Sequence, residues 1–168
     1  MQLKILSHSD VEQARIWRND NMSMNRTPHL LTQEQQGRFY QEVICNRNAN
    51  ARYWGIWEEE IFIGMGEIIN ISTENRNGEI GLSMHPDYIG AAGQAIGVIL
   101  EQGFDYLNLE NIYGEVYKCS AYLEIWKATA LKFNAISCYL PCRKFWEGKY
   151  YDSILFTINK GDWKACHK

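Results

Sequence analysis

The spacing of apolar residues changes several times along the chain, and each change predicts an element of secondary structure. Residues 3–6 are apolar enough for a short strand. Ser9 and Glu12 have the spacing of a capping box, in which two side chains satisfy free backbone N–H groups at the start of a helix. Thr32 and Gln35 repeat this spacing after a polar loop. Two helices are therefore expected near the N-terminus.

The period of the apolar residues then falls to two, which is typical of strands. Two segments rich in β-branched and aromatic residues, 52–57 and 61–71, are joined by an acidic turn. A third strand is expected at 79–84, and Pro86 ends it because proline has no N–H to donate to a sheet. These three strands predict an antiparallel meander.

The second half of the chain alternates between helical and extended patterns. The expected segments are a helix after the small-residue loop 90–95, a strand at 111–117, a helix at 120–132 and strands near 136–145 and 151–158. This order indicates an α+β (mixed α/β) fold with one central, mostly antiparallel sheet of about seven strands flanked by about four helices. The 168 residues contain no linker rich in Pro, Gly or Ser, so a single domain spanning residues 1–168 is expected.

Composition and charge narrow the classes of function. The chain is 46% hydrophobic and 22% charged, which excludes a disordered protein. Its 17 basic and 20 acidic residues give a net charge of −3, which argues against binding to nucleic acid or to an anionic membrane. No apolar run approaches the roughly 18 residues of a membrane span, and the N-terminus lacks the apolar segment of a signal peptide.

The cysteines favour a reducing compartment. There are five of them, and an odd number without a secretory signal is typical of free thiols in the cytoplasm. Cys138 and Cys142 have a spacing seen in zinc sites, but no paired Cys or His residues accompany them, so no metal is expected.

The sharpest local feature is the loop of small residues at 90–95, between an expected strand and an expected helix. Small residues let backbone N–H groups approach a ligand, and a helix N-terminus adds unpaired donors and the positive end of the helix dipole. This pattern is typical of a pyrophosphate site, although an ordinary strand-to-helix turn has the same composition. No Lys-Ser or Lys-Thr pair follows the loop, so hydrolysis of a nucleoside triphosphate is not expected.

Several motifs together resemble the GNAT (Gcn5-related) N-acetyltransferases. The coenzyme A loop of that family, Q/R-x-x-G-x-G/A, is matched at Gly93 and Ala95, with Gly90 in the place of its Gln or Arg. Trp17-Arg18-Asn19 is similar to a signature of the amino-sugar nucleotide members, and residues 148–152 resemble the closing hairpin of the family. The likeness covers about residues 3–160. It is greatest to the branch of ribosomal-protein, spermidine and amino-sugar nucleotide (pseudaminic-acid pathway) acetyltransferases.

The resemblance implies a fold and a cosubstrate. In this family the sheet splays beside the strand equivalent to 79–84, and acetyl-CoA lies in the gap, where an exposed strand edge offers N–H and C=O groups. The chain would then bind acetyl-CoA, without a metal, and pass the acetyl group to an amine. The implied cofactor-binding residues are Leu82, Ser83, Met84, Gly90, Ala91, Ala92, Gly93, Gln94, Ala95 and Ser120.

Two residues are the catalytic candidates. Glu67 lies on an expected strand of mostly apolar residues and resembles an active-site glutamate of the polyamine members, which makes it the candidate base, although a water-facing strand position is the alternative. His85 is the second candidate base. The tyrosine that protonates the thiolate in this family is replaced here by Trp126 or Lys127, depending on the alignment. Tyr122 is therefore the substitute acid, with a core aromatic residue as the alternative.

The acceptor side is expected to be built by the early helices, with Trp17, Arg18 and Asn19 as substrate-binding residues. Arg18 can bind a phosphate through two parallel hydrogen bonds, or it is a surface charge. The predicted function is acetylation of a primary amine on a small molecule, an amino sugar linked to a nucleotide, as in bacterial surface-sugar biosynthesis. Protein N-termini or polyamines are alternative acceptors, and a CoA-binding module with impaired catalysis is an alternative of another class. Exposed strand edges are compatible with a homodimer.

Overall fold

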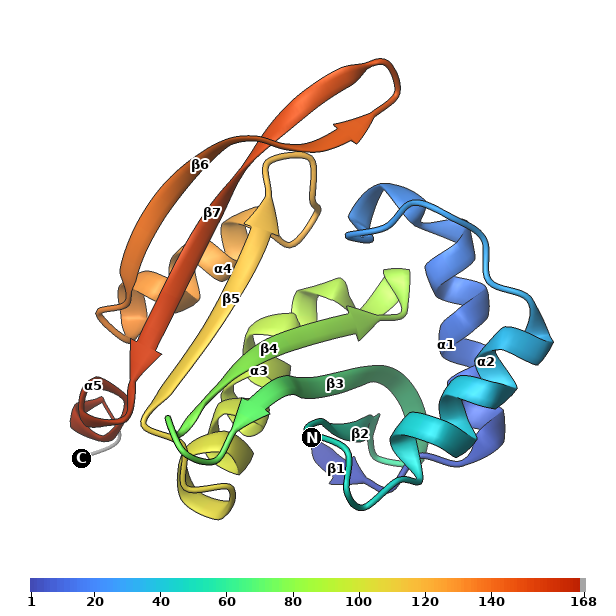
Figure 1. Ribbon diagram of the computed structural model, residues 1–168, viewed down its shortest axis with the longest axis horizontal. Helices are drawn as coiled ribbons and strands as arrows, with labels where there is room; N and C mark the ends of the chain where they lie inside the picture. The colour runs from blue at the N-terminus through green and yellow to red at the C-terminus, as the bar shows by residue number, and fades with distance from the viewer. Residues whose placement is uncertain (167–168) are drawn as a thin grey trace.

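The computed structural model describes residues 1–166, and seven strands in this part of the chain form one sheet (Figure 1). The strands are β1 Gln2–Lys4, β2 Arg52–Glu58, β3 Ile61–Ser72, β4 Asn77–Met84, β5 Asn111–Tyr117, β6 Ile136–Trp146 and β7 Lys149–Asn159. Their order across the sheet is β1-β2-β3-β4-β5-β7-β6. All neighbouring strands are antiparallel except β4 and β5, which are parallel. The expected mixed sheet is therefore confirmed.

Helices lie on both faces of this sheet. The α-helices are α1 His8–Asp20, α2 Gln33–Phe39, α3 Ala92–Glu101, α4 Leu123–Lys132 and α5 Lys160–Ala165. Short 3-10 segments follow α1 (η1, Met22–Met24) and β4 (η3, Pro86–Ala91), and π-helical turns extend α2 (η2, Tyr40–Ile44) and α3 (η4, Gln102–Tyr106). A Cβ added to Gly66 of β3 would contact Ile99 of α3. The next residue, Glu67, faces the other side, toward α1 and α2.

The main core lies between α3 and the strands β2 to β5 and β7. Its fully buried side chains include Ile56, Ile63, Ile68, Ile96, Ile99, Leu100, Phe104, Ile112, Phe156 and Ile158. Burying a side chain of this size stabilises the fold by about 2 kcal/mol. This core fixes β4 against α3, so the strand edge that faces β5 is held in a defined position.

The sheet opens between β4 and β5. These strands pair only at Asn77 with Asn111, Gly78 with Ile112 and Glu79 with Tyr113. From Ile80 to Met84, no strand within residues 1–166 pairs with β4 on this side, and Figure 1 shows β4 and β5 diverging toward the end of β4. The splay expected beside residues 79–84 is therefore present, and along it main-chain groups of β4 are not paired with a neighbouring strand.

Three sequence expectations about the ends of elements are wrong. Helix α1 is capped by Ser7 and Asp10 and begins at His8, because Ser7 Oγ accepts the Asp10 N–H (3.2 Å) and Asp10 Oδ2 accepts the Ser7 N–H (2.8 Å). Apolar Leu6 and Val11 are both buried at the two positions where a hydrophobic staple fixes a helix start. The first strand is Gln2–Lys4 rather than 3–6, and α5 is a fifth α-helix that the apolar pattern did not predict.

Candidate functional site

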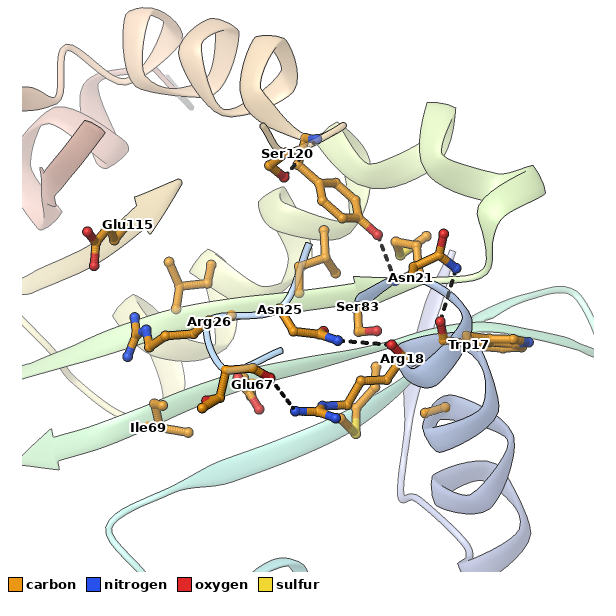
Figure 2. Close-up of a pocket in the computed structure, with 18 of the residues that line it drawn as sticks. Trp17, Arg18, Asn21, Asn25, Arg26, Glu67, Ile69, Ser83, Glu115 and Ser120 are labelled. Atoms are coloured by element: carbon orange, nitrogen blue, oxygen red, sulfur yellow. Dashed lines mark hydrogen bonds between the residues drawn. The ribbon is translucent and has the colours of Figure 1, made fainter. Parts of the chain in front are cut away.

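A cavity of about 500 Å³ occupies the opening of the sheet (Figure 2). Its walls come from α1, the loop between α1 and α2, α2, the strands β3, β4 and β5, and the start of α4. No helix among residues 1–166 is long and apolar enough to cross a membrane, and no group of His, Cys, Asp and Glu in that range is arranged to hold a metal ion.

Glu67 projects into this cavity from β3. It lies opposite Gly81 of β4, and a Cβ added to Gly81 would lie 2.7 Å from Glu67 Cγ, so only glycine leaves room for this carboxylate. Burial and, to a smaller extent, the charge of Glu79 raise the pKa of Glu67 to about 7, although Arg26 partly opposes this shift. A carboxylate with a pKa near neutrality exists in both forms at physiological pH and can accept a proton from an ammonium group.

Two further carboxylates line the cavity, but each already has partners. Glu79 of β4 forms an ion pair with Arg26 and accepts a hydrogen bond from Asn70 Nδ2 (3.0 Å). Glu115 of β5 accepts hydrogen bonds from Arg143 Nε (3.0 Å) and Ser153 Oγ (2.6 Å). Burial alone would raise the pKa of Glu115, but these hydrogen bonds outweigh it and lower the pKa.

The contrast among the three carboxylates singles out Glu67. Within residues 1–166 it has no ion-pair or hydrogen-bond partner, whereas Glu79 and Glu115 each have an arginine. Of the negative charges in the cavity, Glu67 is therefore the one available to a ligand in the described part of the chain.

Tyr122 lies at the edge of β4 that faces the gap. Its hydroxyl accepts a hydrogen bond from the Met84 backbone N–H (3.0 Å), and its side chain is almost completely buried. Burial raises the pKa of Tyr122, although the Met84 N–H partly opposes this. The hydroxyl therefore keeps its proton at neutral pH and can donate it. Tyr122 is thus the buried aromatic residue of one interpretation and also lines the cavity, and its role as the acid stays a prediction.

The backbone of β4 alternates in the direction it faces. The His85 N–H donates to Ile63 O of β3 (2.9 Å), whereas the Met84 N–H points to Tyr122 and hence to the gap. By the same alternation, Leu82 turns its main-chain groups to the gap. Ser83 turns its carbonyl to β3, where it would lie 2.7 Å from a Cβ added to Gly64, so Ser83 offers the cavity its side chain instead.

The start of α3 fits the phosphates expected of acetyl-CoA. Ala91 is the N-cap residue and no side chain caps the helix, although the Ala92 N–H donates to Ile89 O of the preceding 3-10 segment. A Cβ at Gly90 would meet no atom within 4 Å, and one at Gly93 only Ile125 Cγ2 at 3.9 Å. Ala92 and Ala95 point into the core, and Gln94 is exposed. Residues 90–95 do not line the cavity, so its lining does not test their predicted role in binding acetyl-CoA.

Ser120 and Trp126 lie at the start of α4 and both line the cavity. Ser120 Oγ accepts the Tyr122 N–H (3.2 Å), so this serine holds the turn that presents the tyrosine. Trp126 is buried and packs on Phe156, with ring centres 4.7 Å apart. The alignment that put Trp126 in the place of the family's tyrosine therefore leads to a core residue.

The three residues Trp17, Arg18 and Asn19 do not all face the cavity. Trp17 and Arg18 line the cavity, while Asn19 does not. Trp17 stacks on Phe62 with ring centres 5.3 Å apart and is 8% exposed. Asn19 uses both ends of its amide on the backbone of Leu31, at 2.9 and 3.0 Å, and so ties the loop to α1.

Arg18 lines the cavity and also forms hydrogen bonds within the protein. Its guanidinium donates to the carbonyls of His29 (2.9 Å) and Thr27 (3.2 Å), and burial lowers its pKa. No carboxylate lies within 4 Å of it among residues 1–166. Since a guanidinium has five N–H donors, Arg18 retains donors for an anionic ligand.

His85, the second candidate base, has a structural position instead. Its Nδ1 accepts the Asp87 N–H (3.1 Å), and its ring packs edge-on against Trp17. It does not line the cavity. Its place before Pro86 is that of a helix cap, as the turn interpretation predicts.

Sequence reasoning missed several residues of the site. Asn21, Asn25, Arg26, Glu79 and Glu115 all line the cavity (Figure 2). Glu79 and Glu115 carried the same signal as Glu67, a carboxylate in an otherwise apolar strand. The residues of the loop after α1 carried no signal, because only the tertiary structure brings that loop to the sheet.

Comparison with known proteins identifies the family and the fold of this chain. Residues 1–118 match the model of the acetyltransferase (GNAT) domain. A mutant form of spermidine N-acetyltransferase from Vibrio cholerae has 19% sequence identity over 100% of both chains, with a TM-score of 0.83. The Vibrio cholerae enzyme in complex with CoA and spermine has 23% identity over 97% of both chains, with a TM-score of 0.80. At this identity the similarity shows a common fold. No curated protein matches the chain.

Proposed function

The chain belongs to the GNAT acetyltransferase family of acetyl-CoA-dependent N-acetyltransferases, and from this premise we propose that its acceptor is a primary amine on a compact, hydroxylated small molecule, of the amino-sugar class and linked to a nucleotide. The observation that carries this proposal is the charge balance of the cavity. Glu67 is the carboxylate without a partner, and it can hold one ammonium group.

Neutral amides support the proposal because they suit sugar hydroxyls. Asn21 Nδ2 donates to Trp17 O (3.0 Å), Asn25 Nδ2 to Arg18 O (2.9 Å) and Gln36 Nε2 to Val11 O (3.3 Å). Each amide oxygen is left without a partner in residues 1–166 and can accept a hydroxyl hydrogen. Arg18 adds donors for a phosphate on the same wall.

The catalytic residues have distinct roles in this proposal. Glu67 removes a proton from the ammonium group, so that the amine nitrogen can bond to the acetyl carbonyl carbon. Tyr122 donates its hydroxyl proton to the sulfur as the carbon–sulfur bond breaks, and the second proton of the attacking nitrogen passes to the tyrosinate oxygen, which leaves the free thiol, the neutral amide and a reprotonated Tyr122. The Met84 N–H donates to the Tyr122 hydroxyl in the free protein, and in this proposal it turns to the carbonyl oxygen of the bound thioester, where it would stabilise negative charge. Acetyl-CoA supplies the activated acetyl group.

A polyamine is the second candidate acceptor. The similar structures are named as spermidine or spermine acetyltransferases, and three carboxylates line the cavity of this chain. Against this acceptor, Arg26 and Arg143 already occupy Glu79 and Glu115. A molecule with several positive charges would therefore find one available carboxylate, Glu67, and two carboxylates that are already paired with arginines.

An acceptor panel tests the proposal. Thiol release from acetyl-CoA is measured with nucleotide-linked amino sugars, free amino sugars, spermidine, spermine and a peptide. We expect kcat/KM for an amino-sugar nucleotide to exceed that for either polyamine by about 10²-fold, because a polyamine cannot form two or three of the polar contacts that the sugar nucleotide forms. Preference for spermidine or for the peptide would replace the proposed acceptor. Thermal stabilisation by acetyl-CoA without thiol release for any amine would indicate a binding module that has lost catalysis.

A further inference from the structure

We infer that Lys144 of β6 is a positioning residue, which closes one wall of the acceptor cavity by holding the backbone of the loop after α1. This inference rests on the proposed function, since it assigns that cavity to the acceptor. Lys144 Nζ donates to the carbonyl of Ser23 and to that of Asn25 (2.7 Å). These two carbonyls belong to a loop more than a hundred positions earlier in the sequence.

Lys144 is unusual among the residues of its strand. It is 4% exposed, while its neighbours Arg143 and Phe145 are exposed. It directly follows a β-bulge between Leu140 and Lys144, and bulges bend a strand and re-aim its side chains. A buried lysine without partners would strongly destabilise the fold. The contacts of this ammonium group must therefore compensate for its removal from water.

Those contacts are carbonyls and aromatic rings. Lys144 Nζ lies 5.2 Å from the ring centre of Tyr117 and 5.8 Å from that of Trp146. Burial lowers the pKa of Lys144. No carboxylate lies within 4 Å of Nζ among residues 1–166. The two loop carbonyls are thus the direct hydrogen-bond acceptors for this charge, and charge-assisted hydrogen bonds are about twice as strong as neutral ones.

The loop held in this way carries residues of the cavity. Asn25, Arg26 and Thr27 all line it, and Arg26 forms the ion pair with Glu79. Figure 1 shows that α1 and β6 lie on opposite sides of the opening between β4 and β5, with the loop after α1 facing the β6–β7 hairpin. The contact from Lys144 therefore spans the opening of the sheet. Cys119 Sγ adds a weaker contact to Ser23 O (3.8 Å) from the same side.

This arrangement separates the two substrates. The loop does not include β4 or the start of α3, where acetyl-CoA is expected to bind. Loss of the Lys144 contact should therefore weaken acceptor binding and leave acetyl-CoA binding intact. A lysine that only stabilised the fold would change both to a similar extent, or neither.

The first measurement is hydrogen exchange of the backbone amides of residues 22–27, which does not depend on the identity of the acceptor. In Lys144→Met we expect exchange to accelerate by about 10-fold, because two charge-assisted hydrogen bonds are lost. Lys149→Met is the matched control, since Lys149 is an exposed lysine of the same hairpin whose Nζ lies over Tyr151. In Lys144→Arg, exchange should stay close to that of the wild type, because a guanidinium can also donate to both carbonyls.

The second measurement is kinetic and uses whichever amine of the panel the wild type acetylates. Lys144→Met should raise KM for that amine by about 10-fold and change KM for acetyl-CoA less than about twofold, with Lys144→Arg restoring the acceptor KM. If methionine prevents folding, Lys144→Gln is measured by the same criteria.

Unchanged exchange at residues 22–27, or equal effects on both KM values, overturns the inference. If the wild type acetylates no amine of the panel, the proposed function fails. The loop contact is then supported or rejected by the exchange rates alone.

Discussion

The two ends of the cleft are built in different ways. At the end where we propose that acetyl-CoA binds, the candidate contacts are main-chain groups: those of the β4 edge beyond its pairing with β5, and those at the start of α3, which no side chain caps. At the acceptor end they are side chains, contributed by α1, the following loop, α2, β3 and β5. One end therefore depends on the local path of the backbone, and the other on contacts between distant segments.

This difference has consequences for substitution. Apart from a change to proline, a substitution leaves the main-chain donors in place. Binding at the proposed acetyl-CoA end should therefore be sensitive mainly to added side-chain bulk. The acceptor end is sensitive to loss of single charged or polar groups, and each of these depends on its neighbours. Glu67 keeps a pKa of about 7 because of burial and of Glu79 beside it. The predictions below test this division.

The largest effect is expected at Glu67. Glu67→Gln removes the proton acceptor and should lower kcat/KM by about 10³-fold, within the range for general bases. In the wild type, activity should rise with pH and level off above about 7, because the deprotonated carboxylate is the active form. The variant should lose this rise. Glu124→Gln, whose carboxylate is exposed and pairs with Lys127, is the control. A pH profile that is the same in Glu67→Gln and the wild type would exclude Glu67 as the base.

A smaller effect is expected at Tyr122. Tyr122→Phe keeps the buried ring and removes the proton donor, so kcat should fall by about 10²-fold while KM for the acceptor changes little. It also leaves the Met84 N–H without its partner, which should lower the free energy of unfolding by on the order of 1–2 kcal/mol. Steady-state kinetics and chemical denaturation separate the two effects. Tyr106→Phe at an exposed position is the control, and a Tyr122→Phe enzyme with wild-type kcat would leave the thiolate without this acid.

At the acetyl-CoA end, added bulk is the test. Gly93→Val places a side chain in open space above the first turn of α3, where the protein has only Ile125 nearby. Folding should therefore change little, while KM for acetyl-CoA should rise by about 10-fold if the loop binds the pyrophosphate. Gly97→Val is the matched control, because it adds the same side chain to α3 at a position that is also open. Equal KM values for the two variants would remove the phosphate site from residues 90–95.

The smallest effect on catalysis is expected at Asn19. Asn19→Ala removes both hydrogen bonds to the Leu31 backbone and should lower the free energy of unfolding by on the order of 1–2 kcal/mol. Because Asn19 does not line the cavity, KM for the acceptor should change less than about threefold. A large increase in this KM without loss of stability would return Asn19 to the substrate-binding residues predicted from the sequence.

The elements of the fold were largely predictable because each has a local signal. The strands of the meander and the Thr32 capping box follow from period and spacing, and the structure confirms both. The start of α1 was not, because two serines and two acidic residues give two possible caps. The choice falls on Ser7, where Leu6 and Val11 are both buried, and burial is not visible in the spacing alone.

The site was predictable in part for the same reason. Glu67 stood out as a charged residue in an apolar strand. The small residues at 90–95 predicted a segment whose backbone N–H groups can approach a pyrophosphate, and this stays a prediction. Arg26 and Asn25 could not be found in this way, since a polar loop has many such residues. Their place in the cavity depends on contacts with Glu79, with the backbone of Arg18 and with Lys144 of a hairpin at the other end of the chain.

Gly81 controls the position of the proposed proton acceptor, because the Glu67 side chain occupies the space that a methyl group at Gly81 would fill. Gly81→Ala would displace the Glu67 side chain without removing any ionisable or hydrogen-bonding side chain from the protein. We expect such a variant to be inactive although it keeps the Glu67 carboxylate, and therefore to allow both substrates to be bound together in a crystal.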